Sequence, residues 1–219
     1  MAPKPNNAAP GRITPEEVAR NMKREYDFAA RDQFDKSLDV IQKHIEELSR
    51  PDLDIKNLVE FTVKMIYRQF HIKEVSIGLK SESDGLFRYV TMMGMRANVW
   101  TEHQKLTYDQ DSLFDEKVYK FTNISKYSKL FLAENEPYDA DEKGTYSEHL
   151  MSSSKRRHLD DSIEGDYLDM LILNGRGQLS GWIEVNGTWE GKLPTVNTIK
   201  CLEVVASLIG VALSLKPYG

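Results

Sequence analysis

The feature that most constrains the fold is a pair of strand-like segments that flank a short Gly-rich turn. Residues 167–173 (Tyr-Leu-Asp-Met-Leu-Ile-Leu) and 179–186 (Leu-Ser-Gly-Trp-Ile-Glu-Val-Asn) lie on either side of Asn-Gly-Arg-Gly at 174–177. Strands joined by such a turn pair as a β-hairpin. The sheet must therefore be antiparallel at this point.

A long apolar helix is predicted directly after this hairpin. Thr195 is the expected N-cap, and the apolar pattern continues to about Leu215. Glu203 interrupts the apolar run, which we take as too short to cross a bilayer. Because the helix is apolar on most sides, it should be buried on more than one side. One side can lie on the sheet, and the other needs the first helix or a second subunit.

The N-terminal part of the chain divides into a tail and a helical extension. Residues 1–13 are rich in Pro, Gly and Asn, and we expect a disordered tail. Residues 14–37 are predicted as a helical extension that starts at Thr14-Pro15-Glu16-Glu17, and the helical pattern runs on to about Ser49. A heptad seam is expected at Phe34, Leu38, Ile41, Ile45 and Leu48, with His44 on the helix surface.

The remainder, residues 38–216, predicts a single α+β domain. Asp54 can cap a helix over 55–70, and residues 74–81 and 86–95 alternate as two strands around a Ser-Asp-Gly turn. Residues 96–165 show no sustained period, so we expect short helices, one or two strands and long loops there. A long irregular region inside a domain is commonly functional or disordered.

Composition excludes several classes of function. The 29 Lys and Arg residues against 34 Asp and Glu give a formal net charge of −5, which argues against non-specific nucleic-acid binding. Cys201 is the single cysteine, so the chain has no disulfide framework and no thiolate-rich metal site. The start has no apolar stretch of the secretory kind. We expect a cytoplasmic protein that contacts neither nucleic acid nor membrane.

The order of these elements resembles that of GAF domains. The last third carries the detail: the strand at 167–173, its Gly turn, a second strand of the form Gly-x-aliphatic-x-aliphatic at 181–185, Leu193-Pro194-Thr195 and the terminal helix. Residues 118–126 (Val-Tyr-Lys-Phe-Thr-Asn-Ile-Ser-Lys) look like the family's mid-domain strand and polar turn. The resemblance covers about residues 38–215.

The resemblance implies a central antiparallel sheet of five to six strands with the N- and C-terminal helices packed on one face. The irregular middle would then form a pocket over the other face. It further implies a small-molecule-sensing and dimerisation module in signal transduction or regulation that is not an enzyme. A homodimer would form through the N- and C-terminal helices.

Three ligand classes of the family are not supported by this sequence. The Asn-Lys…Phe…Asp-Glu signature of the cyclic-nucleotide binders is missing, and Cys201 lies on the terminal helix rather than in the region where bilins attach. One cysteine is also too few for the thiol–disulfide cycle of the members that reduce methionine sulfoxide. No cofactor is assigned on this basis.

Polar residues on the predicted strands supply the candidate binding site. In a functional interpretation, Trp182 is a stacking wall and charged strand residues contact a ligand, because buried charge is costly unless it is paired or used. The alternative is a solvent-facing sheet with cross-strand ion pairs. The Ser-rich basic loop at 152–158 offers hydroxyl and guanidinium groups that suit a phosphate or a carboxylate. The alternative for this loop is a basic segment exposed to solvent. The candidate ligand-binding residues are Lys80, Arg88, Tyr89, Tyr146, His149, Arg156, Asp169, Trp182 and Glu184.

Two other functions stay open. An enzyme on the same fold would work through a carboxylate pair such as Asp169 and Glu184, although no catalytic motif is present. An interaction domain would have a degenerate pocket. No metal site is predicted, because His149 and His158 lie beside acidic residues but in no metal-ligand spacing.

Overall fold

The computed structural model describes residues 15–28 and 33–219. The chain separates into two units, Met1–Asp32 and Gln33–Gly219. The first contains helix α1 (Pro15–Phe28), which begins at the predicted proline and leaves Val18 and Met22 exposed. The predicted tail, the N-cap Thr14 and the continuation of the helix through 29–32 lie outside the described residues.

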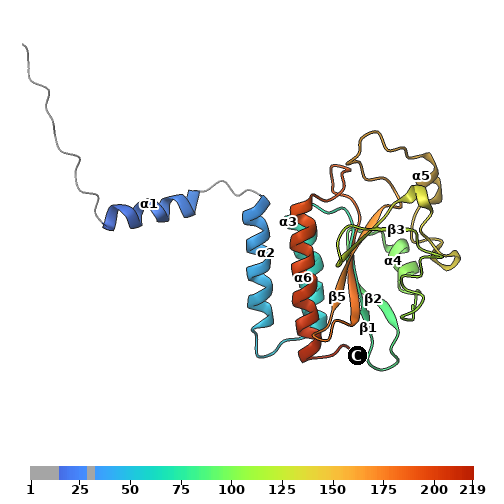
Figure 1. Cartoon of the computed structure of the whole chain (residues 1–219), viewed down its shortest axis with the longest axis horizontal. Helices are drawn as coiled ribbons and strands as arrows, with labels where there is room; N and C mark the ends of the chain where they lie inside the picture. The colour runs from blue at the N-terminus through green and yellow to red at the C-terminus, as the bar shows by residue number, and fades with distance from the viewer. Residues whose placement is uncertain (1–14, 29–32) are drawn as a thin grey trace, which may run out of the picture. The chain divides into compact units, whose positions relative to one another are not determined.

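The second unit is built around a six-stranded antiparallel sheet (Figure 1). Its strands lie in the order β2-β1-β6-β5-β4-β3, and every neighbouring pair is antiparallel. This confirms the predicted α+β class. The strands are β1 (Val75–Lys80), β2 (Phe87–Met93), β3 (Phe121–Asn123), β4 (Ser128–Phe131), β5 (Tyr167–Leu173) and β6 (Leu179–Val185).

Helices cover one face of the sheet, as expected. Helices α3 (Ile55–Gln69) and α6 (Val196–Leu215) pack on the strands, and α2 (Gln33–Leu48) packs outside them on α6 and α3 (Figure 1). Asp54 and Thr195 cap α3 and α6 as predicted, each accepting a hydrogen bond from a backbone N–H three residues on. The main core lies in this interface, where the inward rows of the strands meet α3 and α6.

The buried side of α2 differs from the predicted heptad seam. Leu38 and Ile45 are each 49% exposed, whereas Val40 and His44 are fully buried. The ring of His44 lies 2.9 Å from the Val40 carbonyl oxygen and 3.0 Å from Thr62 Oγ1 on α3. The predicted surface position of His44 is therefore wrong. Thr62 satisfies the buried imidazole, and the sequence of α2 alone does not reveal that partner.

Helix α6 has the bounds that the sequence predicts, from the Thr195 N-cap to Leu215. Its 20 residues are long and apolar enough to cross a membrane, so the expectation that it is too short is wrong. Just over half of its apolar window is buried inside the domain, which is the position of a core helix. Cys201 is buried on this helix, and its Sγ donates to the Ser37 carbonyl oxygen at 3.5 Å.

The irregular middle of the chain covers the opposite face of the sheet. It contributes short helices, the strands β3 and β4 at one end of the sheet, and long loops, as predicted, and within 118–126, predicted as a strand with its polar turn, residues 121–123 form the strand. The helical pieces are α4 (Ala97–His103), η1 (Ala133–Asn135), η2 (Ala140–Glu142) and α5 (Glu148–Ser153). A second apolar cluster holds this cover to the sheet: Phe87, Leu106, Tyr108, Leu113 and Trp182.

Gly210 sets how closely α6 lies on the sheet. A Cβ at this position would come closer than 3.0 Å to the Leu173 carbonyl oxygen on β5. Gly210→Ala should therefore lower the free energy of unfolding by about 1–3 kcal/mol, although alanine gains about 1 kcal/mol in helix propensity. Denaturant unfolding measures the change. The control Ser207→Ala, on an exposed side of the same helix, should stay within about 0.5 kcal/mol. A Gly210→Ala variant as stable as this control would contradict the close approach.

Candidate functional site

A row of polar side chains crosses the covered face of the sheet. The strand register places Asp169 of β5 opposite Glu184 of β6, and it extends the row to β1 and β4. The row reads Asn123, Lys129, Asp169, Glu184 and Ser76. Asp169 is 4% exposed and Glu184 is 7% exposed. The alternative of a solvent-facing sheet is therefore wrong, because the middle segment covers these carboxyl groups.

Aromatic side chains border the polar row. On one side, the rings of Phe131 and Tyr167 stack with their centroids 4.3 Å apart. On the other side, Trp182 meets the ring of Tyr89 edge-on at 5.2 Å. The indole lies directly over Gly78 of β1, where any Cβ would collide with it. The absence of a side chain at Gly78 thus makes room for the indole of Trp182, the residue predicted to form a stacking wall of the site.

Asp169 and Glu184 form a buried pair of carboxyl groups. Tyr89 Oη donates to Glu184 Oε2 at 2.7 Å. Asp169 Oδ1 has no hydrogen-bond partner in the part of the chain that the structure describes. Burial raises the pKa of Glu184 to about 7. Burial, followed by the charge of Glu184, raises the pKa of Asp169 well above its ordinary value. Both shifts favour the protonated carboxyl, so the pair resists carrying two negative charges near neutral pH.

A third acid, Glu142, fastens the cover over this pair. Tyr108 Oη and Tyr119 Oη donate to Glu142 Oε1 at 2.7 and 3.1 Å, and the backbone N–H of Asp139 donates to Oε2 at 2.7 Å. The sequence analysis missed these residues. They lie in the irregular segment, where no period shows which side chains face the sheet.

Two small cavities lie between the sheet and its cover. One of about 40 Å³ is lined by residues that include Glu74, His103 and Tyr146, and one of about 20 Å³ is lined by residues that include Asp169 and Trp182. They share four lining residues: Tyr89, Glu142, Tyr167 and Glu184. A water molecule needs roughly 10–15 Å³, so together the cavities hold a handful of water-sized groups. None of their lining residues is Lys or Arg.

The structure brings five of the nine candidate residues together around these cavities. They are Tyr89, Tyr146, Asp169, Trp182 and Glu184. Tyr146 stacks on Tyr138 with ring centroids 4.1 Å apart.

Three other candidates lie elsewhere. Arg88 forms an ion pair with Asp84 at 2.6 Å on the exposed first hairpin. Lys80 lies over the ring of Phe87 and lines a separate surface groove near the end of the chain. His149 is exposed on α5.

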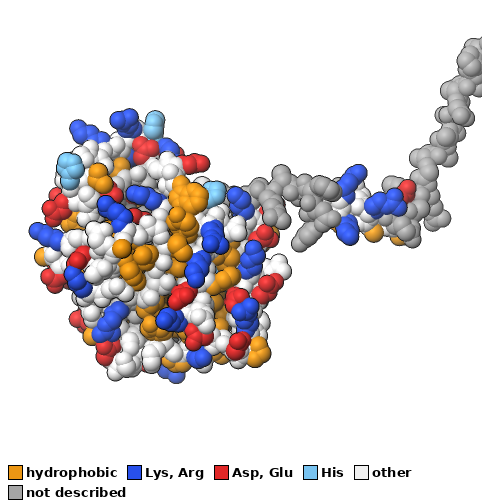
Figure 2. All heavy atoms as spheres, turned by 180° about the vertical axis from the view of Figure 1, so that it is seen from behind, with side chains coloured by type: hydrophobic (Ala, Val, Ile, Leu, Met, Phe, Trp, Pro, Cys, Tyr) orange, Lys and Arg blue, Asp and Glu red, His pale blue; other side chains and the backbone are white. Residues whose placement is uncertain are grey.

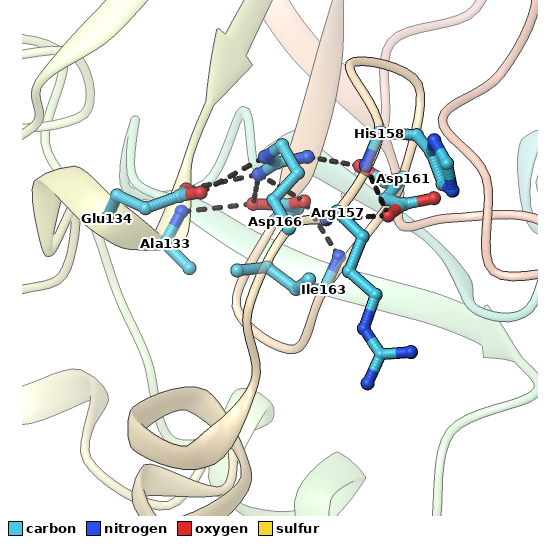
Figure 3. A network of polar contacts seen from close by, with 8 residues as sticks. Ala133, Glu134, Arg157, His158, Asp161, Ile163 and Asp166 are labelled. Atoms are coloured by element: carbon cyan, nitrogen blue, oxygen red, sulfur yellow. Dashed lines mark hydrogen bonds and ion pairs between the residues drawn. The ribbon is translucent and has the colours of Figure 1, made fainter.

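Arg156, the last candidate, belongs to a network that ties the cover together (Figure 3). Its Nη2 lies 2.9 Å from both carboxylate oxygens of Asp166, and its Nε donates to Glu134 at 3.0 Å. Asp166 also accepts hydrogen bonds from the backbone N–H groups of Ala133 and Ile163. The guanidinium is therefore already bound by protein carboxylates, and it is not among the residues that line the two cavities.

The described residues contain no group of three or more His, Cys, Asp or Glu side chains arranged to hold a metal ion.

Comparison with known proteins adds a fold relationship. No family model and no curated protein matches this sequence. Solved structures do match. The GAF domain of an Acinetobacter phosphoenolpyruvate-protein phosphotransferase has a TM-score of 0.52 at 10% identity, over 81% of this chain and 92% of that one. The phycoerythrobilin-bound GAF domain of a cyanobacterial phytochrome has a TM-score of 0.52 at 14% identity, over 81% and 94%. The chain has a GAF-like fold.

An enzyme also shares this fold. The free methionine-R-sulfoxide reductase of Neisseria meningitidis, solved with its substrate, has a TM-score of 0.53 at 10% identity, over 86% of this chain and 96% of that one. The GAF-like fold is thus found in a phosphotransferase, a phytochrome and a reductase. The chemistry of this chain must be argued from its own residues.

The buried carboxyl pair should make stability depend on pH. A carboxyl whose pKa is higher in the folded state stabilises fully below its unfolded pKa of about 4.5, and this stabilisation is lost as pH rises to about 7. The side chain of Glu184→Gln does not ionise, so it loses no stabilisation as the pH rises. The decrease in the free energy of unfolding between pH 5 and 7 should therefore be about 1–3 kcal/mol smaller in this variant than in wild type. Urea unfolding at several pH values measures it. The control Glu60→Gln, on exposed α3 surface, should retain the wild-type profile. Identical profiles for Glu184→Gln and wild type would show that Glu184 is not buried as described.

The Arg156 network should be a major contributor to stability. Arg156→Met leaves the fully buried carboxylate of Asp166 without its ion-pair partner, which should cost about 3–5 kcal/mol in thermal or denaturant unfolding. Arg157→Met is the matched control, since the Arg157 side chain is exposed and points away from the network in Figure 3. Its effect should be below about 0.5 kcal/mol. Equal effects for the two variants would contradict the assignment.

Proposed function

We propose that this chain is a non-catalytic ligand-sensing domain that acts in signal transduction or regulation as a cytoplasmic homodimer. The ligand site is the pair of cavities between the sheet and its cover. The observation that carries this proposal is the buried face itself: a covered sheet surface with two carboxyl groups, one of which has an oxygen without a hydrogen-bond partner among residues 15–28 and 33–219. A merely structural layer would bury apolar side chains at lower cost.

The α2 and α6 surface supports the dimer. Leu38 and Ile45 of α2, and Val204 and Val211 of α6, are exposed and repeat at seven-residue spacing on two adjacent helices. The contact between Cys201 and the Ser37 carbonyl places these two stripes at the same level. Apolar stripes of this period are typical of helix pairs that pack in a coiled-coil manner. A second copy would cover them.

Helix α6 links the cavities to this surface. One side of α6 packs on β5, the strand that carries Asp169, and another side carries the exposed valines. Glu203 of α6 also accepts hydrogen bonds from Ser128 Oγ, at 2.6 Å, and Ser125 Oγ. A ligand that binds one arrangement of the sheet and cover better than another would therefore shift the packing of α6.

Charge and thiol chemistry support the remaining parts of the proposal. Acidic and basic side chains are interspersed on the face shown in Figure 2, which fits a small molecule or protein partner better than nucleic acid. Cys201 is a free, buried thiol, as is common in reducing compartments.

A catalytic function is the alternative, and the carboxyl pair favours it. Asp169 and Glu184 have raised pKa values, which is typical of acid–base groups. Asn and Gln substitutions would abolish turnover of such an enzyme while leaving the fold intact. An interaction domain with a degenerate pocket is distinguished by the lack of any ligand.

Native mass spectrometry of the freshly purified full chain tests sensing and dimerisation together. The expected spectrum is that of a dimer carrying a bound small molecule. Hydrogen exchange then follows α6 before and after the ligand is removed, and exchange in α6 should change. A ligand-free monomer, or a bound ligand with no effect on α6, would contradict the proposal.

A charge on the helix stripe should break the dimer. Val211→Glu places carboxylates in an apolar interface, so the dimer dissociation constant should rise by about tenfold or more in sedimentation velocity. Leu150→Glu, on exposed α5 of the cover, is the control and should remain dimeric. Wild-type chain that sediments as a monomer at micromolar concentration would contradict the dimer.

A further inference from the structure

The charge around the two cavities is one-sided. Their lining includes five acids, Glu74, Glu142, Glu164, Asp169 and Glu184. The only basic side chain in the lining is His103, whose pKa burial lowers, so that it is neutral at pH 7. Lys129 is the cation in the polar row, but its Nζ donates to Asn123 at 3.0 Å and lies over the Phe121 ring at 3.7 Å. Lys73 Nζ lies 3.8 Å from Glu164 Oε2 but is not among the lining residues, so no Lys or Arg lines the cavities beside Asp169 and Glu184.

Asp169 points independently to a ligand. It is more than nine-tenths buried and lines the smaller cavity, and its Oδ1 has no partner among the described residues. A buried carboxylate oxygen normally accepts at least one hydrogen bond. The group that would satisfy Oδ1 is an N–H or O–H donor inside the cavity.

The aromatic residues that line the smaller cavity suit a positively charged hydrogen-bond donor. The rings of Trp182, Tyr89 and Tyr108 lie around the smaller cavity, with Tyr89 and Tyr108 edge-on to the indole at 5.2 and 5.9 Å. Aromatic faces attract cations by about 0.5–2 kcal/mol each. Carboxylates and aromatic faces together are the chemistry that recognises an organic ammonium group.

An outer pocket adjoins the smaller cavity. This larger outer pocket of about 280 Å³ is lined by three further acids, Asp115, Asp139 and Asp141, and by Lys105, which is paired with Glu102. It shares a wall with the smaller cavity, made of Tyr108, Tyr119 and Glu142. Two hydroxyl-to-carboxylate hydrogen bonds hold this wall closed. An acidic outer pocket concentrates cations at the wall.

We propose that the chamber between Asp169, Glu184 and Trp182 binds the ammonium head of a compact organic cation, which enters by displacing the Tyr108/Tyr119–Glu142 wall. This inference rests on the proposed sensing function and names the ligand class for it. The cavity volumes limit the part that is bound to an ammonium or methylated ammonium head. Any longer part of the ligand would extend into the outer pocket.

Cation binding should release a proton. Burial favours the protonated form of the carboxyl pair, and a bound cation favours the ionised form: the carboxyl O–H gives its proton to solvent as the cation enters. The groups that face the pair come from each surrounding element and are Ser76, Tyr89, Tyr108, Lys129, Glu142 and Tyr167. The tyrosines stay protonated, since burial raises the pKa of each. The released proton thus comes from the buried acids, which are the carboxyl pair together with Glu74 and Glu142, whose pKa values burial also raises.

Calorimetric titration of the full chain with methylammonium chloride, at ionic strength held constant with sodium chloride, tests the proposal. Acetamide and acetate are the neutral and anionic probes of similar size. Methylammonium should bind saturably, at least about tenfold tighter than either, and its affinity should rise by up to about tenfold per pH unit between pH 6 and 7. Buffers of different ionisation enthalpy should report close to one proton released.

Variants test whether methylammonium binding depends on this site or on the overall negative charge of the chain. Asp169→Asn, which keeps the shape of the side chain, should weaken methylammonium binding by about tenfold or more. Tyr89→Phe, a second variant, should shift the pH midpoint of binding. Asp84→Asn, on the exposed hairpin, is the control and should bind as wild type does.

Equal binding of methylammonium to Asp169→Asn and wild type, or no binding beyond that of sodium, would overturn the cation assignment. If acetate or another uncharged or anionic molecule binds the cavities instead, the sensing function stands and the cation class falls. If no small molecule of any charge occupies them, both fall.

Discussion

Desolvation of two facing carboxyl groups is the constraint on which the rest of the structure depends. Asp169 and Glu184 lie on neighbouring strands and point into a space from which water is largely excluded. Such a pair cannot carry two charges without a partner, so it retains a proton or takes up a cation. Either state is a cost that the remainder of the domain must offset, chiefly through the apolar core on the helix side of the sheet.

The cover shields these carboxyl groups from water, and two hydrogen-bond networks within it help to hold it in place. Glu142 joins two tyrosines and a backbone N–H on one side of the site, and Asp166 joins Arg156 and two backbone N–H groups on another. Between these points the cover consists of short helices and loops, and Leu106, Tyr108 and Leu113 pack it on Phe87 and Trp182 of the sheet in a cluster smaller than the main core. Segments of this kind open at lower free energy than the core. The fold thus combines a rigid sheet and helix layer with a cover that can yield.

Much of this architecture could be predicted from the sequence, because its signals are local. The hairpin at 167–185 depends on the Asn-Gly-Arg-Gly turn and on period-two alternation, and the caps at Asp54 and Thr195 depend on one side chain each. The same alternation predicts Trp182 and Glu184 on the face opposite the helices, whereas Asp169 stands out only as a charge within an otherwise apolar strand.

The remainder depends on contacts between distant segments. His44 was assigned to the surface because Thr62, its partner, lies on another helix. The sequence predicts Arg156 as a ligand contact, because its ion-pair partners Asp166 and Glu134 lie next to it only in the folded cover. Tyr108, Tyr119 and Glu142 lie in a segment without period, so no pattern indicated that their hydroxyl and carboxyl groups meet. Gly78 had no visible role until the position of the Trp182 indole was known.

Carbon-13 NMR titration of the side-chain carboxyl groups gives the most direct test of the central constraint. With Asp169→Asn and Glu184→Gln used for assignment, the two resonances should show that the pair still holds a proton at pH 6, and that it loses this proton when methylammonium is added. Two carboxyl groups that both ionise near pH 4, with or without the cation, would mean that the face is open to water and that the site does not exist as described.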